Sequence, residues 1–245
     1  MPLCQINAKD DQLAAPRQAL RDLRAAFAGL PKSAPVIVLI HGYKFSPARA
    51  DASPHTHILS SQPSRTCWKA VSWPRRLGVG GEAQDEPLCI ALGWEARGSF
   101  WSAYCNAAQA GRALARLITL IRRLRPGQPV DVLAHSLGGR VALSALPHLS
   151  PNAMGRAVLM APAETQTRAA RWMDCPAGRS VEVLHIASRA NNASDSMLEW
   201  LVAPHRWGDR ALGLGRGLRQ GLSNWIDIRL DDPATLAALT ALGYP

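Results

Sequence analysis

One serine stands where a nucleophile is expected. Residues 130–139 read Val-Asp-Val-Leu-Ala-His-Ser-Leu-Gly-Gly, an apolar run that leads directly into Ser136. Ala134 and Gly138 lie two positions to either side of the serine, and a sharp turn from a strand into a helix requires such small residues. The turn exposes the serine Oγ above a sheet and directs backbone N–H groups toward the reaction site. The pattern predicts nucleophilic chemistry at Ser136; its structural alternative is a serine that caps the helix.

A serine nucleophile also needs a base, a group that orients the base, and N–H donors for the oxyanion that develops on the substrate. The segment Ile40-His41-Gly42-Tyr43 follows another apolar run and predicts the donors. Gly42 allows the backbone to turn toward a substrate, so that the N–H of Tyr43 or Lys44 can point inward. The backbone N–H of Leu137 is expected to be the second donor.

The substrate pocket is expected beside these donors. Four residues are expected to line it, namely His41, Gly42, His135 and Trp94. The side chains of His41 and His135 are expected to pack beside the nucleophile rather than to activate it. The aromatic residues Phe100, Trp101 and Tyr104 are either further pocket walls or core residues, which is the commoner role.

The elements that would position these residues follow from the alternation of short apolar runs with longer helical patterns. This alternation predicts βαβ units, and so an α/β fold with a mostly parallel sheet, in one domain over residues 1–245. Strands are expected at residues 35–40, 68–72, 88–93, 130–134, 157–160, 181–187 and 225–229. Helices are expected at residues 11–30, 101–124, 137–146, 164–173, 195–202 and 233–242, and a polar loop at 46–64.

At these motifs the chain resembles the α/β-hydrolase superfamily. The resemblance rests on a strand followed by His-Gly at 41–42 and a strand followed by Ala-His-Ser-Leu-Gly-Gly at 134–139. The segments at 72–74 (Ser-Trp-Pro) and 93–95 (Gly-Trp-Glu) resemble a bacterial, esterase-like branch of uncharacterised serine hydrolases. The resemblance covers roughly residues 35–200. It implies helices on both faces of the sheet, a site at the carboxyl ends of the strands, and a catalytic triad in the order Ser, acid, His.

The resemblance places the acid of the triad after the strand at 181–187. Asn191 and Asn192 occupy the early positions there, and Asp195 is the carboxylate that can accept a charge-assisted hydrogen bond from an imidazolium. We therefore expect Asp195 to be the acid; the alternative is that it caps the helix that follows. Asn192 can orient an imidazole, but an amide does not stabilise its charge.

The base is expected to be His205, because it is the histidine that follows the acid in the chain. It precedes the strand at 225–229, whereas the superfamily places its histidine beyond the last strand. After that strand the chain offers Asp231, Asp232 and a helix. Three interpretations stay open: the chain lacks the usual C-terminal histidine segment, His205 has been recruited, or catalysis has been lost.

The remaining histidines have structural explanations. His185 lies in a buried strand, and His148 ends the helix after Ser136, where a cation suits the helix dipole. His55 and His57 lie in the polar loop, and no third ligand stands at a suitable spacing from them. We therefore expect no metal site.

Composition excludes several classes of protein. No apolar run approaches the roughly 18 residues of a membrane span, and the N-terminus lacks a signal peptide, so no stable membrane insertion is expected. The five cysteines show no regular spacing, which predicts free thiols and a cytoplasmic location. The net charge of +10 is scattered rather than clustered, so nucleic acid is not an expected partner.

These features predict a serine hydrolase that cleaves an ester or related acyl bond through an acyl-Ser136 intermediate. Its partner would be a small-molecule acyl substrate, and no cofactor is implied; the oligomeric state is left open. The alternative is a catalytically impaired α/β-hydrolase-like module that binds a ligand or a partner protein. A weaker candidate, drawn from the net charge, is a binder of anionic surfaces.

Overall fold

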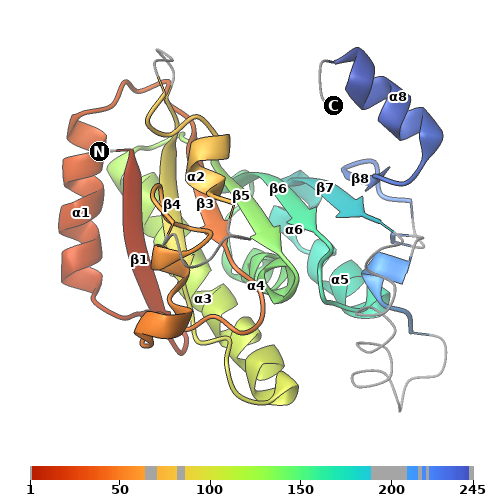
Figure 1. Cartoon of the computed structure of the whole chain (residues 1–245), viewed down its shortest axis with the longest axis horizontal. Coiled ribbons are helices and arrows are strands. Elements are labelled where there is room, and N and C mark those ends of the chain that lie inside the picture. Colours follow the sequence, from red (N-terminus) through yellow and green to blue (C-terminus); the bar gives the residue numbers. More distant parts are fainter. Residues whose placement is uncertain are drawn as a thin grey trace.

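An eight-stranded sheet forms the centre of the computed structural model, which describes residues 2–63, 71–81, 86–188, 209–214, 217–218 and 221–242. The strand order is β2-β1-β4-β3-β5-β6-β7-β8, and every neighbouring pair is parallel except β1 with β2 (Figure 1). The strands are β1 (Leu3–Lys9), β2 (Gln12–Leu13), β3 (Val36–Ile40), β4 (Leu88–Gly93), β5 (Val130–His135), β6 (Met154–Met160), β7 (Glu182–Ala187) and β8 (Trp225–Arg229). The predicted α/β fold with a mostly parallel sheet is confirmed.

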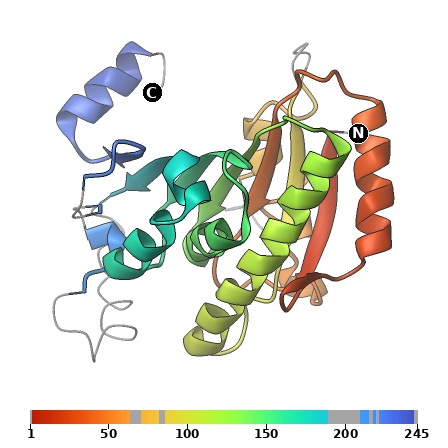
Figure 2. The same cartoon turned by 180° about the vertical axis from the view of Figure 1, so that it is seen from behind.

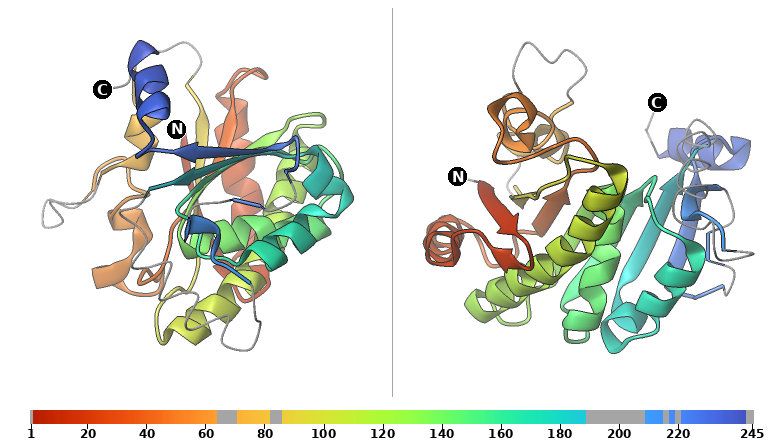
Figure 3. Two further views of the ribbon diagram at one scale, coloured as in Figure 1. Left: turned by 90° about the vertical axis from the view of Figure 1, so that its right-hand side faces the viewer. Right: turned by 90° about the horizontal axis from the view of Figure 1, so that it is seen from below.

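Helices cover the two faces of the sheet unequally. The larger layer, seen from behind in Figure 2 and from below in Figure 3, consists of α1 (Pro16–Ala28), α3 (Phe100–Leu124), α4 (Leu137–Ala145), α5 (Gln166–Met173) and α6 (Pro176–Ser180). The main hydrophobic core lies between this layer and the sheet. On the other face α2 (Trp73–Arg76) packs against a smaller cluster around Leu39 and Ala91. The last helix, α8 (Pro233–Ala241), lies beyond β8, and none of its side chains is buried.

The central strands explain why the sequence prediction succeeded there. All six residues of β4 and four of the five residues of β3 are buried, because strands covered on both faces are apolar throughout. The expected strand at 157–160 begins earlier, at Met154, and those at 130–134 and 181–187 agree with β5 and β7 within one residue.

The prediction for the N-terminus was wrong. No strand was expected at residues 3–9, where β1 alternates buried with more exposed side chains at the edge of the sheet. The helix expected from residue 11 begins at Pro16, because Gln12–Leu13 instead forms a short antiparallel strand against β1. A proline suits the first turn of a helix, where its missing N–H costs no hydrogen bond.

Other predicted elements fall partly or wholly outside the described residues. The helix expected at 195–202 lies outside them, as does most of the strand expected at 68–72; its last two residues, Val71 and Ser72, are not in a strand. Ser72 instead caps α2, its Oγ accepting the Arg75 N–H at 3.2 Å. Among the described residues no helix combines the length and the apolar character needed to cross a membrane.

Candidate active site

Ser136 lies at the junction of β5 and α4 in a strained backbone conformation. Its φ is 54° and its ψ is −123°, a region that residues with a side chain rarely occupy. Its own N–H donates to the Met160 carbonyl at 3.0 Å, and its carbonyl accepts the N–H groups of Gly139 and Ala163 at 2.9 Å each. Such strain costs of order 1–3 kcal/mol and persists only where neighbouring contacts hold it. The turn has the geometry of a nucleophile elbow.

Two glycines allow the segment after β3 to reach this turn. A β-carbon at Gly138 would lie 2.6 Å from the Ile40 carbonyl oxygen and 2.7 Å from that of His41. A β-carbon at Gly42 would lie 2.9 Å from the Cβ of Ser136. Both contacts are shorter than carbon tolerates, so only glycine lets the ends of β3 and β5 come together here. The predicted closeness of the two motifs is therefore a feature of the structure.

Some backbone N–H groups near Ser136 donate a hydrogen bond within the protein, and others do not. The Lys44 N–H donates to the Ala96 carbonyl at 2.9 Å, so it is not available to a substrate. Within the described part of the chain, the N–H groups of Tyr43 and Leu137 have no acceptor. The Tyr43 hydroxyl donates to the Gly98 carbonyl at 2.7 Å, which fixes this residue from its other end. Of the two N–H groups expected as the first oxyanion donor, that of Lys44 is therefore bonded and that of Tyr43 is not.

The side chains of His41 and Trp94 lie together in the core beside Gly42. Both side chains are buried, with exposed fractions of 0% and 1%, and their rings stack with centroids 5.4 Å apart. His41 Nδ1 is 2.9 Å from the Gly42 carbonyl, and burial lowers the pKa of the imidazole to about 3. Both side chains belong to the core that supports Gly42, and their place in a substrate pocket stays a prediction.

His135 directly precedes Ser136 and stays partly open to solvent. Its ring meets that of Trp73 edge to face, with centroids 6.5 Å apart. The surrounding protein lowers the pKa of this imidazole, so its neutral form is favoured. No hydrogen bond joins it to the Ser136 Oγ.

Two further histidines are engaged by other partners. His55 Nε2 lies 2.7 Å from Asn7 Oδ1, and burial lowers the pKa of this imidazole to about 4. His185 is 2% exposed, and its Nδ1 lies 2.6 Å from Asp227 Oδ1 on the neighbouring strand β8. Among the described residues, no side chain hydrogen-bonds to the Ser136 Oγ. The described histidines therefore do not supply an obvious base.

The expected acid and base, Asp195 and His205, lie outside the described residues. Asp195 follows β7 and His205 precedes β8, so both belong to the connection between the last two strands. The two assignments stay predictions. As for metal ions, the described residues contain no group of three or more His, Cys, Asp or Glu side chains arranged to hold one.

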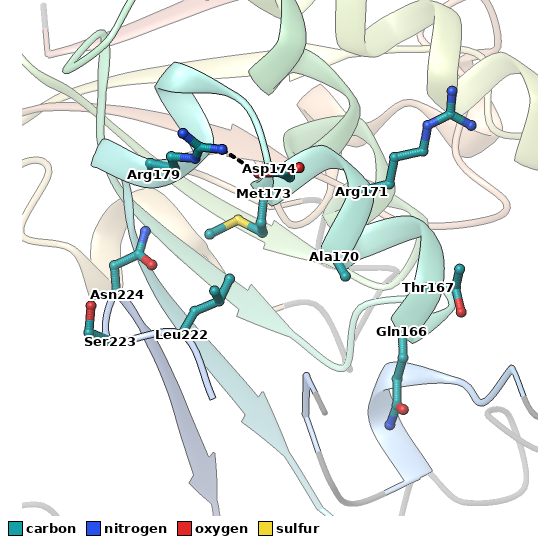
Figure 4. A pocket seen from close by; sticks show the side chains of 10 residues that line it. All are labelled: Gln166, Thr167, Ala170, Arg171, Met173, Asp174, Arg179, Leu222, Ser223 and Asn224. Atoms are coloured by element: carbon teal, nitrogen blue, oxygen red, sulfur yellow. Dashed lines mark hydrogen bonds and ion pairs between the residues drawn. The ribbon is translucent and has the colours of Figure 1, made fainter. Parts of the chain in front are cut away.

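A cavity of about 610 Å³ lies away from Ser136, between α5, α6 and the start of β8 (Figure 4). Its lining includes Met173 and Leu222 and the ion pair between Asp174 and Arg179, whose nearest atoms are 2.6 Å apart. Figure 4 shows the Arg171 side chain pointing away from Leu222. None of the described residues predicted to carry the chemistry (Ser136, Leu137, Tyr43, His41, Gly42, His135 and Trp94) lines this cavity.

Sequence reasoning missed the group that packs behind the elbow. Arg140, Glu164 and Tyr104 form a buried cluster of hydrogen bonds between α4, the segment after β6, and α3. A charged residue in the middle of the apolar run of α4 was the available signal, because an arginine is almost never buried without a partner. Its partner lies 24 residues away and cannot be found from spacing alone.

The strand order, the elbow after β5 and the donor segment after β3 define an α/β-hydrolase fold. The chain belongs to the family described as "Alpha/beta hydrolase of unknown function (DUF900)", which it matches over residues 25–167, more than half of its 245 residues. No curated protein matches the chain.

Solved structures of esterases are similar to this chain at a distance. One is an acetylxylan esterase at 0.90 Å resolution, with 15% identity and a TM-score of 0.35, covering 62% of this chain and 82% of the esterase. Another is Trichoderma reesei cutinase in complex with a C11Y4 phosphonate inhibitor, with 16% identity and a TM-score of 0.28, covering 69% of this chain and 72% of the cutinase.

Proposed function

We propose that this chain is a serine hydrolase that cleaves an ester or related acyl bond of a small molecule. The strained backbone of Ser136 carries the proposal, because such strain clusters where it serves a function. The unbonded N–H groups of Leu137 and Tyr43 support it, since an oxyanion needs two donors that nothing else occupies.

In the proposed reaction the Ser136 Oγ attacks the carbonyl carbon of the ester as the base removes its proton. The N–H groups of Leu137 and Tyr43 bind the oxygen that becomes negative in the tetrahedral intermediate. When the intermediate collapses, the alcohol leaves with the proton from the base and the acyl group stays on Ser136. A water molecule, deprotonated by the same base, then releases the acid and restores the serine.

We assign the base to His205 and the acid to Asp195, which together would complete the triad. The support is the order of the chain, because both residues follow Ser136 and His205 follows Asp195. Three other histidines, His41, His55 and His185, each have another partner.

The test compares hydrolysis of p-nitrophenyl acetate and butyrate by the wild type, Ser136→Ala and His205→Ala, with fluorophosphonate labelling of each. Ser150→Ala and His148→Ala are matched controls, because both residues are exposed and lie beyond the C-terminal end of α4, whereas Ser136 precedes its N-terminal end. The proposal requires that Ser136→Ala is unlabelled and inactive. Loss of activity in His205→Ala supports His205 as the base. Unchanged activity in this variant means that another histidine is the base. If the wild type is no more active than Ser136→Ala, the proposal that this chain is a serine hydrolase is refuted.

One observation favours a second candidate, an α/β-hydrolase-like module that binds a ligand without turning it over. No described histidine hydrogen-bonds to the Ser136 Oγ, and without a base only about 10³–10⁴ of the rate enhancement over water remains. Such a module binds hexanoate in titration calorimetry equally well in the wild type and in Ser136→Ala.

We also propose a cytoplasmic location, from the irregular spacing of the five cysteines. Among the described residues, Cys4, Cys89, Cys105 and Cys175 are free thiols.

A further inference from the structure

The elbow rests on a buried ion pair that the proposed reaction does not use. Arg140 lies on α4 and is 4% exposed, whereas Glu164 lies between β6 and α5 and is 0% exposed. Arg140 Nη1 donates a hydrogen bond to Glu164 Oε2. Two charges removed from water cost several kcal/mol each, which their attraction offsets only when their other hydrogen bonds are also made.

Both members of the pair make further hydrogen bonds, two of them to Tyr104 on α3. Glu164 Oε1 accepts the Tyr104 hydroxyl at 2.6 Å and the Thr165 N–H at 2.8 Å. Arg140 Nε donates to the Tyr104 carbonyl at 2.8 Å, and the guanidinium lies 3.6 Å from the centre of the Tyr104 ring. Burial, with Glu164 next, raises the pKa of the Tyr104 phenol, so its hydroxyl remains a donor. The cluster therefore ties α3 and α4 to the segment after β6.

That segment is the one that holds the backbone of Ser136. Ala163, the neighbour of Glu164, donates its N–H to the Ser136 carbonyl at 2.9 Å. Met160, three residues earlier, accepts the Ser136 N–H at 3.0 Å. Arg140 lies on the helix that begins directly after Ser136, so the ion pair closes a ring of contacts around the elbow.

We propose that the pair Arg140–Glu164 is a positioning device that fixes the backbone of Ser136, and with it the direction of the Oγ and of the Leu137 N–H. The expected effect of the pair on the rate of hydrolysis rests on the proposed hydrolase function. Its expected effect on the backbone conformation of Ser136 does not. The competing explanation is that the pair only stabilises the fold. Buried ion pairs are often no more stabilising than apolar residues of similar size, which argues for a role in geometry.

Glu164→Gln is the main test, because it removes the charge and keeps an oxygen for Tyr104 and Thr165. The matched control is Glu182→Gln, since Glu182 pairs with Arg156 at 2.6 Å on the surface with both side chains more than 40% exposed. Arg140→Lys is a second variant, because lysine keeps the charge but cannot reproduce the fork of contacts. Arg140→Lys takes the place of Glu164→Gln in both measurements if Glu164→Gln does not fold.

The first measurement is amide hydrogen exchange at Ala163, with Leu39 in the central strand β3 as the reference. We expect exchange at Ala163 to accelerate about tenfold or more in Glu164→Gln while Leu39 stays unchanged, because local opening is independent of global unfolding. Equal acceleration at both positions, or none at Ala163, overturns the proposal. This measurement decides the matter even if the wild type proves inactive.

The second measurement is the hydrolysis of p-nitrophenyl butyrate. We expect kcat to fall about 10²-fold with KM within about twofold of the wild type, because a misplaced nucleophile loses rate rather than binding. Glu182→Gln should match the wild type. An active wild type with an unchanged kcat in Glu164→Gln overturns the positioning role, whereas an inactive wild type refutes the hydrolase proposal alone.

Discussion

His41 and Trp94 hold each other through two hydrogen bonds. The Trp94 backbone N–H donates to His41 Nε2, and the Trp94 indole N–H donates to the His41 carbonyl, both at 3.1 Å. Because Nε2 accepts, the proton of the neutral ring lies on Nδ1, which can donate to the Gly42 carbonyl. The pair fastens the end of β3 to the end of β4 beside the segment that approaches Ser136.

This arrangement predicts how stability depends on pH. The pKa of His41 is about 3 in the folded state and near 6.5 in the unfolded chain, so only the unfolded chain takes up the proton between these values. The contribution of His41 is therefore complete above pH 6.5 and is lost as the pH falls toward 3, with a slope of at most about 1.4 kcal/mol per pH unit.

Urea unfolding of the wild type and His41→Gln between pH 4 and 7 measures this slope. We expect a shallower slope in the variant. Part of the slope remains, because His55 is also buried with a pKa of about 4. Parallel curves for the two proteins contradict the prediction, and His148→Gln, at an exposed position, is the control.

Gly42→Ala tests the close approach of the donor segment to the elbow. The new methyl group would lie 2.9 Å from the Ser136 Cβ and 3.0 Å from the His135 carbonyl oxygen. We expect a loss of about 1–3 kcal/mol in the free energy of unfolding from overpacking, and a fall of about 10²-fold in kcat/KM for p-nitrophenyl butyrate. Gly29→Ala is the control, because nothing lies within 4 Å of its β-carbon. Equal behaviour of the two variants contradicts the prediction.

Ser136→Gly is expected to stabilise the protein while it abolishes hydrolysis. Glycine adopts a φ of 54° and a ψ of −123° without the strain of a side chain, so we expect a gain of about 1 kcal/mol in the free energy of unfolding. Ser136→Ala keeps the strain and should not gain. Asn152→Gly is the comparison: its φ is 59°, but asparagine tolerates positive φ, so its gain should be smaller. Thermal unfolding of the three variants decides the order.

Asp227→Asn tests the contribution of the hydrogen-bonded pair between His185 on β7 and Asp227 on β8. Burial opposes ionisation of Asp227, but hydrogen bonds from His185 and Trp225 outweigh it, and its pKa lies below 3.8. The ionised carboxylate therefore contributes stability above pH 3.8 that is lost as the pH falls through the folded-state pKa. Because the side chain is 41% exposed and screened, we expect a loss of only about 1 kcal/mol at pH 7. Identical unfolding curves for the wild type and Asp227→Asn from pH 3 to 7 contradict this.

Local patterns were sufficient for the centre of the fold and for the sharp turn at Ser136. The apolar runs of β3, β4 and β5 have one explanation, a sheet covered on both faces, and the small residues beside Ser136 have one geometry that needs them. The strand β1 was missed because its polar residues Gln5 and Asn7 interrupt the apolar pattern at the sheet edge. A search for continuous apolar runs finds strands covered on both faces but passes over a strand in which buried and exposed residues alternate.

Contacts between distant residues were beyond the reach of the sequence. His185 was expected to be an ordinary core histidine, and its partner Asp227 lies 42 residues later on the adjacent strand. Trp94 was expected to line the substrate pocket beside the elbow, and the sequence did not predict the hydrogen bond from its indole N–H to the His41 carbonyl. Spacing predicts which residues share an edge of the sheet, but packing decides which way their side chains turn.

The described contacts that shape the elbow come from residues between Ile40 and Glu164. The proposed acid and base come from a later stretch, between β7 and β8. The proposed nucleophile and the proposed proton relay thus lie in separate parts of the chain and can diverge independently. A lineage can exchange the connection after β7, and with it the rate or the substrate, and still inherit an intact serine.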